Sequence, residues 1–166
     1  MNNYNNFHIH FGACDLKINI LAVGNIKENY FAGACEEYSK RLGKFCDINI
    51  IEVQEKNKLS TPEQCLLAEA KDIEKHLTGF VVVMDKFGKK FDSISFSKKL
   101  EEIKMTNSTI TFVIGSSYGL DESIKKKANL MMSVSDMTFP HQLFRVLLLE
   151  QICRAFCIEN NITYHK

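Results

Sequence analysis

The stretch TITFVI (residues 109–114) decides the fold class of this 166-residue chain, because it is apolar on both faces. The run FVVVM (80–84) has the same character, and neither run alternates polar with apolar residues. Strands of a parallel sheet covered by helices on both sides have this composition. Two further runs rich in β-branched residues, INILAV (18–23) and INIIEV (48–53), extend the predicted sheet.

Segments with helical periodicity separate these runs. Apolar side chains recur every three or four residues over 30–42, 66–77 and 96–103. The second segment follows TPEQ (61–64), in which Thr61 is expected as the N-cap, Pro62 at the first helical position and Gln64 in a capping box. Strands and helices alternate, so we predict one α/β domain with a mainly parallel sheet and helices on both faces.

The last predicted helix follows MTFPHQLFR (137–145), with Pro140 expected at its first position. Twelve of the 16 residues 143–158 are apolar. The polar residues are scattered around the helix: Arg145, Glu150, Gln151 and Arg154. A helix that is apolar all round is buried all round. We therefore expect a second copy of the chain to cover it in a homodimer; the alternative is a central core helix in a monomer.

Composition narrows the function classes. The net charge is +1, so no strong field draws the chain towards DNA or a membrane. Its six cysteines include no CxxC pair, and scattered thiols of this kind are typical of a reduced, cytosolic protein without a metal site. The N-terminus lacks a basic and then apolar signal, and charges interrupt the longest apolar tract. The sequence therefore predicts a cytoplasmic protein with no membrane partner.

Three segments lie where a ligand is expected: MDKFG (84–88), GSSYG (115–119) and SVSDMTF (133–139). Ligands of open α/β sheets bind beyond the carboxyl ends of the strands. Gly115 and Gly119 would allow the backbone to approach a ligand closely. The spacing matches neither the dinucleotide-binding fingerprint nor the P-loop, which favours a ligand without a polyphosphate.

FVIGSSYGL (112–120), SVSDMTFPHQLFRVLLLEQICRAF (133–156) and the terminal YHK resemble the ribosomal RNA large-subunit methyltransferase H family. That family is the small, single-domain branch of the SPOUT class, and the similarity runs from about Lys17 to Lys166. The resemblance implies a SPOUT-type α/β fold with a C-terminal trefoil knot, an exception to the rule that chains are unknotted, and an obligate homodimer. It also implies S-adenosyl-L-methionine as cofactor and methylation of N3 of a pseudouridine in large-subunit ribosomal RNA of assembled ribosomes.

The resemblance assigns roles to particular positions. The cofactor-binding residues would be Met84, Gly115, Val134, Ser135, Asp136, Met137, Thr138 and Phe139. Arg154 is expected to face the active site and to balance the anion that forms on the imide nitrogen. His165 is the candidate general base, and Tyr164 belongs to a terminal tripeptide that reaches towards the substrate, in the partner's site. His141 and Gln142 are expected to stabilise the cofactor-binding loop.

The chain departs from the family pattern at three places. Ser116 stands where the family has a second glycine, and strain is expected there if that position needs a positive φ. Cys153 replaces a common tyrosine. Residues 1–15 precede the usual start and are expected to form a disordered extension, leaving 16–166 as a single SPOUT domain. Two alternatives remain: a SPOUT methyltransferase with another RNA target, such as transfer RNA, and a cofactor-free RNA- or ribosome-binding dimer, which Ser116 motivates.

Overall fold

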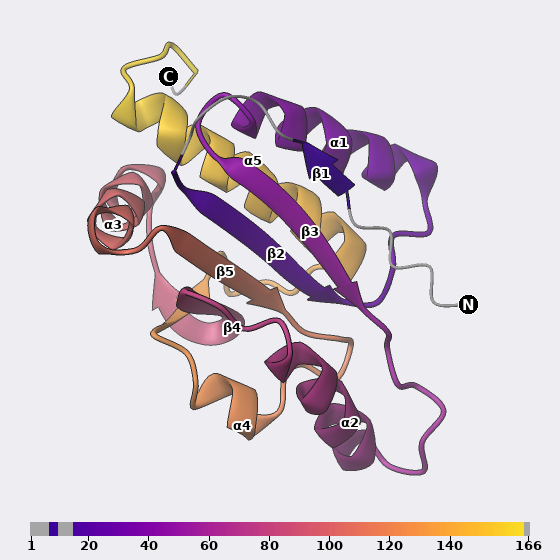
Figure 1. Ribbon diagram of the computed structural model, residues 1–166. Helices are drawn as coiled ribbons and strands as arrows, with labels where there is room; N and C mark the ends of the chain where they lie inside the picture. The colour runs from indigo at the N-terminus through magenta and orange to yellow at the C-terminus, as the bar shows by residue number, and fades with distance from the viewer. Residues whose placement is uncertain (1–6, 10–14, 165–166) are drawn as a thin grey trace.

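One twisted sheet forms the centre of the computed structural model, which describes residues 7–9 and 15–164 (Figure 1). Within these residues the strands follow the order β1-β3-β2-β5-β4-β6. They are β1 (Phe7–Ile9), β2 (Lys17–Val23), β3 (Asp47–Val53), β4 (Phe80–Lys90), β5 (Thr109–Ile114) and β6 (Leu130–Ser133). Strands β2 to β6 are parallel, and β1 runs antiparallel beside β3. The predicted α/β class with a mainly parallel sheet is confirmed.

Helices cover both faces of the sheet (Figure 1). Their bounds are α1 (Asn29–Leu42), α2 (Pro62–Glu74), α3 (Ser93–Thr106), α4 (Glu122–Lys125) and α5 (His141–Glu159). Helices α1, α3 and α5 share one hydrophobic core with the sheet, and α2 and α4 share another on the opposite face. Strand β5 supplies both cores, because Phe112 points to the first and Val113 to the second. This is why TITFVI is apolar on both faces.

The starts of α2 and α5 can be compared with the capping and proline positions predicted from the sequence. Thr61 caps α2 by accepting a hydrogen bond from the Gln64 N–H at 3.3 Å, with Pro62 at the first helical position, as expected. Pro140 lies one residue outside α5, where its ψ of 136° is extended, and its carbonyl accepts from the Phe144 N–H at 2.9 Å. The prediction for Pro140 is therefore wrong by one position, and α5 begins at His141.

Helix α5 packs between α1 and α3, and the covering is uneven. Eight of its 19 residues are buried, Arg145 among them. The least covered side is a stripe of half-buried residues: Leu143, Leu147, Glu150, Arg154 and Ile158. At 100° per residue these positions fall within an arc of about 80° on the side opposite Arg145. The polar residues of α5 therefore differ in their surroundings: Arg145 is buried, whereas Glu150 and Arg154 lie on the partly open side. We call the five residues of this side the α5 stripe.

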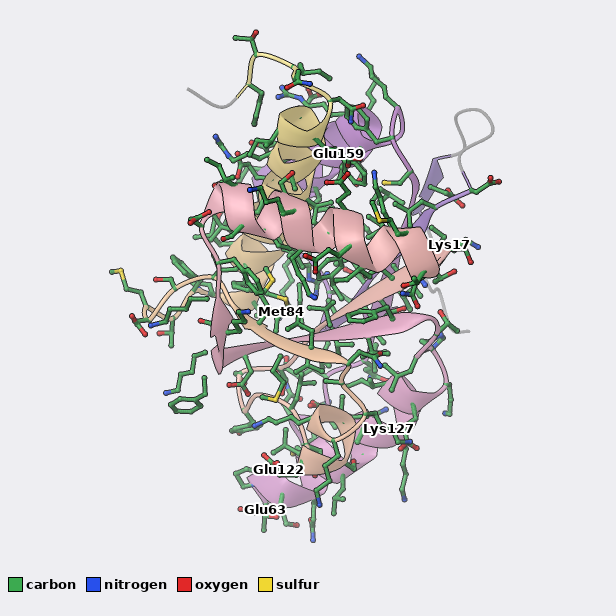
Figure 2. All side chains as sticks on the ribbon, turned by 90° about the vertical axis from the view of Figure 1, so that its left-hand side faces the viewer. Lys17, Glu63, Met84, Glu122, Lys127 and Glu159 are labelled. Carbon is green, nitrogen blue, oxygen red and sulfur yellow. The ribbon has the colours of Figure 1, made fainter. Side chains whose placement is uncertain are left out.

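Charged side chains lie mainly on the outer surfaces of the helices, as Glu63, Glu122 and Lys127 do on the α2 and α4 side (Figure 2). Lys127 bridges the two helices there through an ion pair to Glu74 at 2.5 Å. Within the described residues, every helix is too short or too polar to cross a membrane.

Candidate active site

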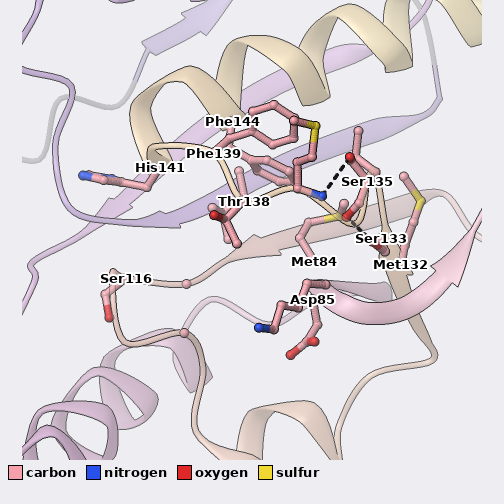
Figure 3. A pocket seen from close by; sticks show the side chains of 16 residues that line it. Met84, Asp85, Ser116, Met132, Ser133, Ser135, Thr138, Phe139, His141 and Phe144 are labelled. Carbon is pink, nitrogen blue, oxygen red and sulfur yellow. Dashed lines mark hydrogen bonds between the residues drawn. The ribbon is translucent and has the colours of Figure 1, made fainter.

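A cavity opens at the carboxyl edge of the sheet, where the three segments singled out in the sequence meet (Figure 3). This inner cavity, of about 160 Å³, is lined by residues 84–86, 114–116, 119, 132–135, 137–139, 141 and 144. Strands β5 and β6 end here on either side of β4, which pairs with both in parallel and loses its regular register after Met84. The expected convergence of 84–88, 115–119 and 133–139 is therefore present in the fold.

A second hollow, the outer cavity, continues from the inner one. Its volume is about 680 Å³, and it shares Met84, Thr138 and His141 with the inner cavity. Its further walls come from residues 117–118 and from Lys125 of α4. Ligand sites of proteins occupy a few hundred Å³ and combine apolar walls with a small number of polar groups. Together the two cavities offer a smaller and a larger space side by side.

The loop between β6 and α5 gives the inner cavity its shape. The Ser133 hydroxyl donates to the Ser135 carbonyl at 3.0 Å, and the Met137 N–H donates to the Ser135 hydroxyl at 3.0 Å (Figure 3). These two bonds curl the chain around the cavity within four residues. Met84 and Met132, both buried, contribute polarizable apolar surface.

A tight turn after β5 forms another wall. The Gly119 N–H donates to the Ser116 carbonyl at 2.9 Å, and the Ser116 N–H donates to the Gly119 carbonyl at 3.2 Å. A Cβ atom on Gly115 would lie 2.3 Å from the Gly119 carbonyl oxygen, so only glycine fits at position 115. The turn itself therefore selects that glycine.

The strain expected at Ser116 is absent. Gly119 carries the positive φ of this turn, at +91°, and Asn161 is the single described non-glycine residue with a positive φ. Ser116 fits its backbone position, and its hydroxyl is buried without a hydrogen-bond partner among the described atoms. A serine here thus adds an unused polar group to the cavity wall. The backbone argument for a lost cofactor does not hold.

Asp85 is a site residue that the sequence reasoning missed. It lines both cavities, accepts a hydrogen bond from the Phe87 N–H at 2.9 Å and pairs with Lys125 at 3.1 Å. Burial pulls the pKa of Asp85 upward, but the Phe87 N–H and the Lys125 charge outweigh it and hold that pKa below its usual range. The carboxylate therefore stays ionised and ties β4 to α4. Its place directly after a buried strand was the signal that could have revealed it.

The first turn of α5 is locked to the loop that follows β2. The Gln142 side-chain oxygen accepts hydrogen bonds from the Lys27 N–H at 2.7 Å and the Glu28 N–H at 3.3 Å. Glu28 is the N-cap of α1 and has no side-chain cap of its own, so Gln142 satisfies donors at the start of a different helix. His141 packs against Gly24, and its Nδ1 is buried. Burial, and then the nearby Arg145 charge, lower the pKa of His141.

A buried ion pair completes this lock. Arg145 is fully buried, and one terminal nitrogen of its guanidinium lies 2.5 Å from the Oε1 atom of Glu52 on β3. Its second terminal nitrogen donates to the Gly24 carbonyl, and Glu52 also accepts from the Ile26 N–H at 3.1 Å. One guanidinium therefore joins α5, β3 and the loop after β2 directly behind the cavity.

Seven of the eight residues expected to bind the cofactor line the inner cavity: Met84, Gly115, Val134, Ser135, Met137, Thr138 and Phe139. Asp136 does not. Its side chain is 81% exposed and pairs with Lys90 of β4 outside the cavity. The ion pair with Lys90, 46 positions earlier in the chain, holds Asp136 outward, and the local sequence could not reveal that contact.

The residues expected to act on the substrate lie elsewhere. Arg154 donates to Glu150 from two nitrogens, at 3.0 and 2.5 Å, and its guanidinium lies 5.0 Å from the centre of the Tyr164 ring. Tyr164 donates to the same Glu150 oxygen at 3.3 Å. Arg154 is 13 positions after His141 on one helix, which separates the two by about 20 Å. Within one chain the structure does not bring Arg154 and Tyr164 to the cavity, and His165 lies outside the described residues.

The state of Tyr164 limits its chemistry. Burial, followed by a hydrogen bond with Tyr38, raises the pKa of Tyr164 to about 12. The phenol therefore keeps its proton at neutral pH and can donate a hydrogen bond but cannot serve as a general base.

Comparison with known proteins places this geometry in a class. The profile described as predicted SPOUT methyltransferase matches residues 16–165. The chain belongs to the SPOUT methyltransferase family. It is similar to the ribosomal RNA large subunit methyltransferase H of Clostridium botulinum strain Kyoto, with 46% identity over 162 residues that cover 91% of this chain and 100% of the relative. The protein of the same name from Caldicellulosiruptor saccharolyticus is 46% identical over 153 residues, covering 90% of this chain and 99% of its own.

A solved structure supports the fold alone. It is a probable methylase family protein from Haemophilus influenzae Rd KW20, with a TM-score of 0.52 and 14% sequence identity. The match covers 92% of this chain and 70% of that protein.

Proposed function

We propose that this protein is an S-adenosyl-L-methionine-dependent methyltransferase that methylates N3 of a pseudouridine in large-subunit ribosomal RNA of assembled ribosomes. The observation that carries the proposal is the inner cavity. Residues from three separate segments gather at the carboxyl edge of the sheet in a chain of the SPOUT methyltransferase family. The names of its relatives, which describe a ribosomal RNA large-subunit methyltransferase, supply the substrate class.

The cavity residues fit the proposed cofactor. Main-chain groups of the loop 134–139 lie at the wall, where they can bond the edge of an adenine ring, and Met84 and Met132 offer apolar surface beside it. The turn after β5 packs so closely that a Cβ atom on Gly115 would meet the Gly119 carbonyl, so this part of the cavity wall has a fixed shape. S-Adenosyl-L-methionine would supply a methyl group already activated by its positive sulfur. The protein must then align the attacking nitrogen with that methyl group and exclude water.

The remaining chemistry concerns the imide nitrogen, which carries a proton at neutral pH and must lose it. In our proposal Arg154 provides the positive charge that stabilises the anion, and His165 accepts the proton. Tyr164, with its pKa raised to about 12, donates a hydrogen bond to the substrate. Residues 16–166 would form the catalytic domain, with the trefoil knot in its C-terminal part. Within the proposed extension 1–15, β1 adds an edge strand to the sheet.

We further propose a homodimer in which a second copy covers the α5 stripe. The stripe combines three aliphatic side chains with the Glu150–Arg154 pair, and it runs the length of the helix on the side opposite the buried Arg145. Because Arg154 lies about 20 Å along the helix from the cavity of its own chain, it would serve the cavity of the partner.

The oligomeric state tests this arrangement. Sedimentation at micromolar concentration should give a dimer, and Leu147→Glu on the stripe should give monomers because a buried charge opposes association. Leu67→Glu, at a 53% exposed position of α2, is the matched control and should leave the dimer intact. A wild-type protein that sediments as a folded monomer contradicts the proposal.

The function itself is tested with a pair of glycine variants. Gly115→Ala should lower S-adenosyl-L-methionine affinity by about 100-fold or more, because the new Cβ atom displaces the turn at the cavity wall. Gly33→Ala on α1, where a Cβ meets nothing within 4 Å, should bind normally. Calorimetry measures the affinity. Methyl transfer from labelled cofactor to whole ribosomes, compared with free transfer RNA, then checks the substrate.

A further inference from the structure

Two aromatic side chains stand uncovered on the walls of the outer cavity. Phe87 is 81% exposed and Tyr118 is 50% exposed, and both line that cavity. Single exposed apolar side chains are common on protein surfaces and need no explanation. Here, however, two exposed aromatic rings lie on the walls of one cavity, next to the proposed cofactor cavity. They point to a binding surface.

Hydrogen bonding fixes the main chain at Phe87 while its ring stays uncovered. The Phe87 N–H donates to the Asp85 carboxylate at 2.9 Å, and Asp85 is itself fixed by Lys125 at 3.1 Å. The Lys86 ammonium lies 4.8 Å from the centre of the Phe87 ring. With 81% of the residue exposed, the ring still offers a face to a ligand. Because the main chain at Phe87 is already fixed, binding needs to order only the side chain.

Tyr118 is presented in a similar way. It occupies the tip of the turn that two main-chain hydrogen bonds close between Ser116 and Gly119. The preceding residue, Ser117, donates to Glu55 at 3.3 Å, which ties the turn to the loop after β3. The backbone under the ring is therefore anchored on both sides while the ring remains half exposed.

Lysine side chains lie near these rings. Lys86 and Lys125 line the outer cavity, where Lys125 pairs with Asp85, and Lys89 lies further along β4, 5.0 Å from the centre of the Phe91 ring. Lys86 and Lys89 make no ion pair with a carboxylate of the described residues, so their charges remain available to a ligand. Aromatic rings combined with unpaired lysines are the means by which proteins hold unpaired nucleic-acid bases and the phosphates between them.

We propose that Phe87 and Tyr118 stack on unpaired bases of the RNA loop that carries the methylated nucleotide, with Lys86 placed to meet the adjoining phosphate. This inference rests on the proposed function, because it places the substrate RNA over the outer cavity while the cofactor occupies the inner one. The two rings position the substrate and take no part in the methyl transfer.

The experiment compares Phe87→Ala, Tyr118→Ala, Phe87→Leu and Phe87→Trp with the wild type on whole ribosomes. Loss of one stacked base changes affinity on the order of 10-fold. Each alanine variant should therefore raise KM for ribosomes about 10-fold, with kcat and S-adenosyl-L-methionine affinity nearly unchanged. Phe87→Leu should resemble Phe87→Ala, because leucine is apolar but has no π face, and Phe87→Trp should retain wild-type KM. Met105→Ala, at a 73% exposed position of α3, is the control and should be silent.

Co-sedimentation with ribosomes gives a readout that does not require methyl transfer. Weaker binding of Phe87→Ala to ribosomes would support the stacking role even if the wild type transferred no methyl group, in which case the proposed function alone would fail. Wild-type affinity of both alanine variants overturns the inference. It is also overturned if Phe87→Leu behaves as wild type, which would indicate an apolar contact with a protein, or if Phe87→Ala loses the cofactor or the dimer.

Discussion

The two ends of helix α5 handle an arginine in opposite ways. At the start of the helix, Arg145 is fully buried and joins Glu52 and the Gly24 carbonyl behind the cavity. Near its end, the side chain of Arg154 is 26% exposed and pairs with Glu150 one turn earlier on the same helix. The first arginine connects three elements of the fold, whereas the second pairs within its own helix and lies against Tyr164. Residue type alone does not tell these two arginines apart; their burial and their partners do.

In our proposal, the active site is divided between the two ends of helix α5. The inner cavity is built from residues of one chain, and Gln142 and Arg145 fix the helix start beside it. Arg154, on the α5 stripe, and Tyr164 lie together near the other end of the helix, away from that cavity. In our proposal this second end of α5 meets the partner subunit.

The largest expected effect follows from breaking the buried Arg145–Glu52 ion pair at the start of α5. Arg145→Met should lower the free energy of unfolding by about 3–5 kcal/mol, because it leaves Glu52 with an unpaired and largely buried charge. Urea unfolding followed by circular dichroism measures the change. The double variant with Glu52→Leu should recover much of the loss. A single variant as stable as the wild type would show that the pair is not what holds the loop after β2 to α5.

A smaller effect, on the rate of methyl transfer and not on stability, is expected near the C-terminal end of α5. Arg154→Ala should slow methyl transfer by about 10²–10³-fold, as expected on removal of one preorganised charge. The free energy of unfolding should change by less than about 1 kcal/mol, because the Arg154 pair is partly solvated. Single-turnover methylation of ribosomes measures the rate, and calorimetry should give unchanged cofactor affinity. Full activity, or outright loss of the cofactor, would contradict the role given to Arg154.

Arg154→Lys sharpens that result. Lysine keeps the charge but lacks the planar arrangement of donors, so the slow rate should persist. Recovery of the wild-type rate by lysine would show that charge alone is sufficient.

The smallest expected effect is a pH dependence of stability that arises from His141 at the start of α5. Burial and the Arg145 charge place the pKa of His141 below its ordinary value of 6.5, while Lys27 lowers it further and Glu55 acts in the opposite direction. As pH falls through the window just below 6.5, the unfolded chain takes up this proton before the folded chain does, so stability is lost there. The slope cannot exceed about 1.4 kcal/mol per pH unit for one group. Urea midpoints between pH 7.5 and 5.5 should fall less in His141→Gln than in the wild type, and equal falls would contradict the assignment.

Much of the fold was readable from local patterns. The four apolar runs became β2 to β5, and the periodic segments and the last apolar run became α1, α2, α3 and α5, because an apolar period reports which face a segment must bury. Two strands were missed. β1 and β6 have three and four residues, too few to show a period. β6 exists because β4 offers it an edge, which is a property of the assembled sheet.

The sequence by itself determined the α/β class, the capping of α2 by Thr61 and the three segments that form the cavity. Each follows from residues close together in the chain, whose propensities and periodicity act over one or two turns. Only the tertiary structure decided that Asp136 points away from the cavity, that Ser116 is unstrained because Gly119 takes the positive φ, and that Arg145 and Arg154 differ. Those outcomes depend on Lys90, on a turn closed across three residues and on Glu52, 93 positions away in the chain. The pairs with Lys90 and Glu52 form only once the chain has folded, and which residue of the 116–119 turn takes the positive φ is set by how that turn closes, so no residue pattern announced these outcomes.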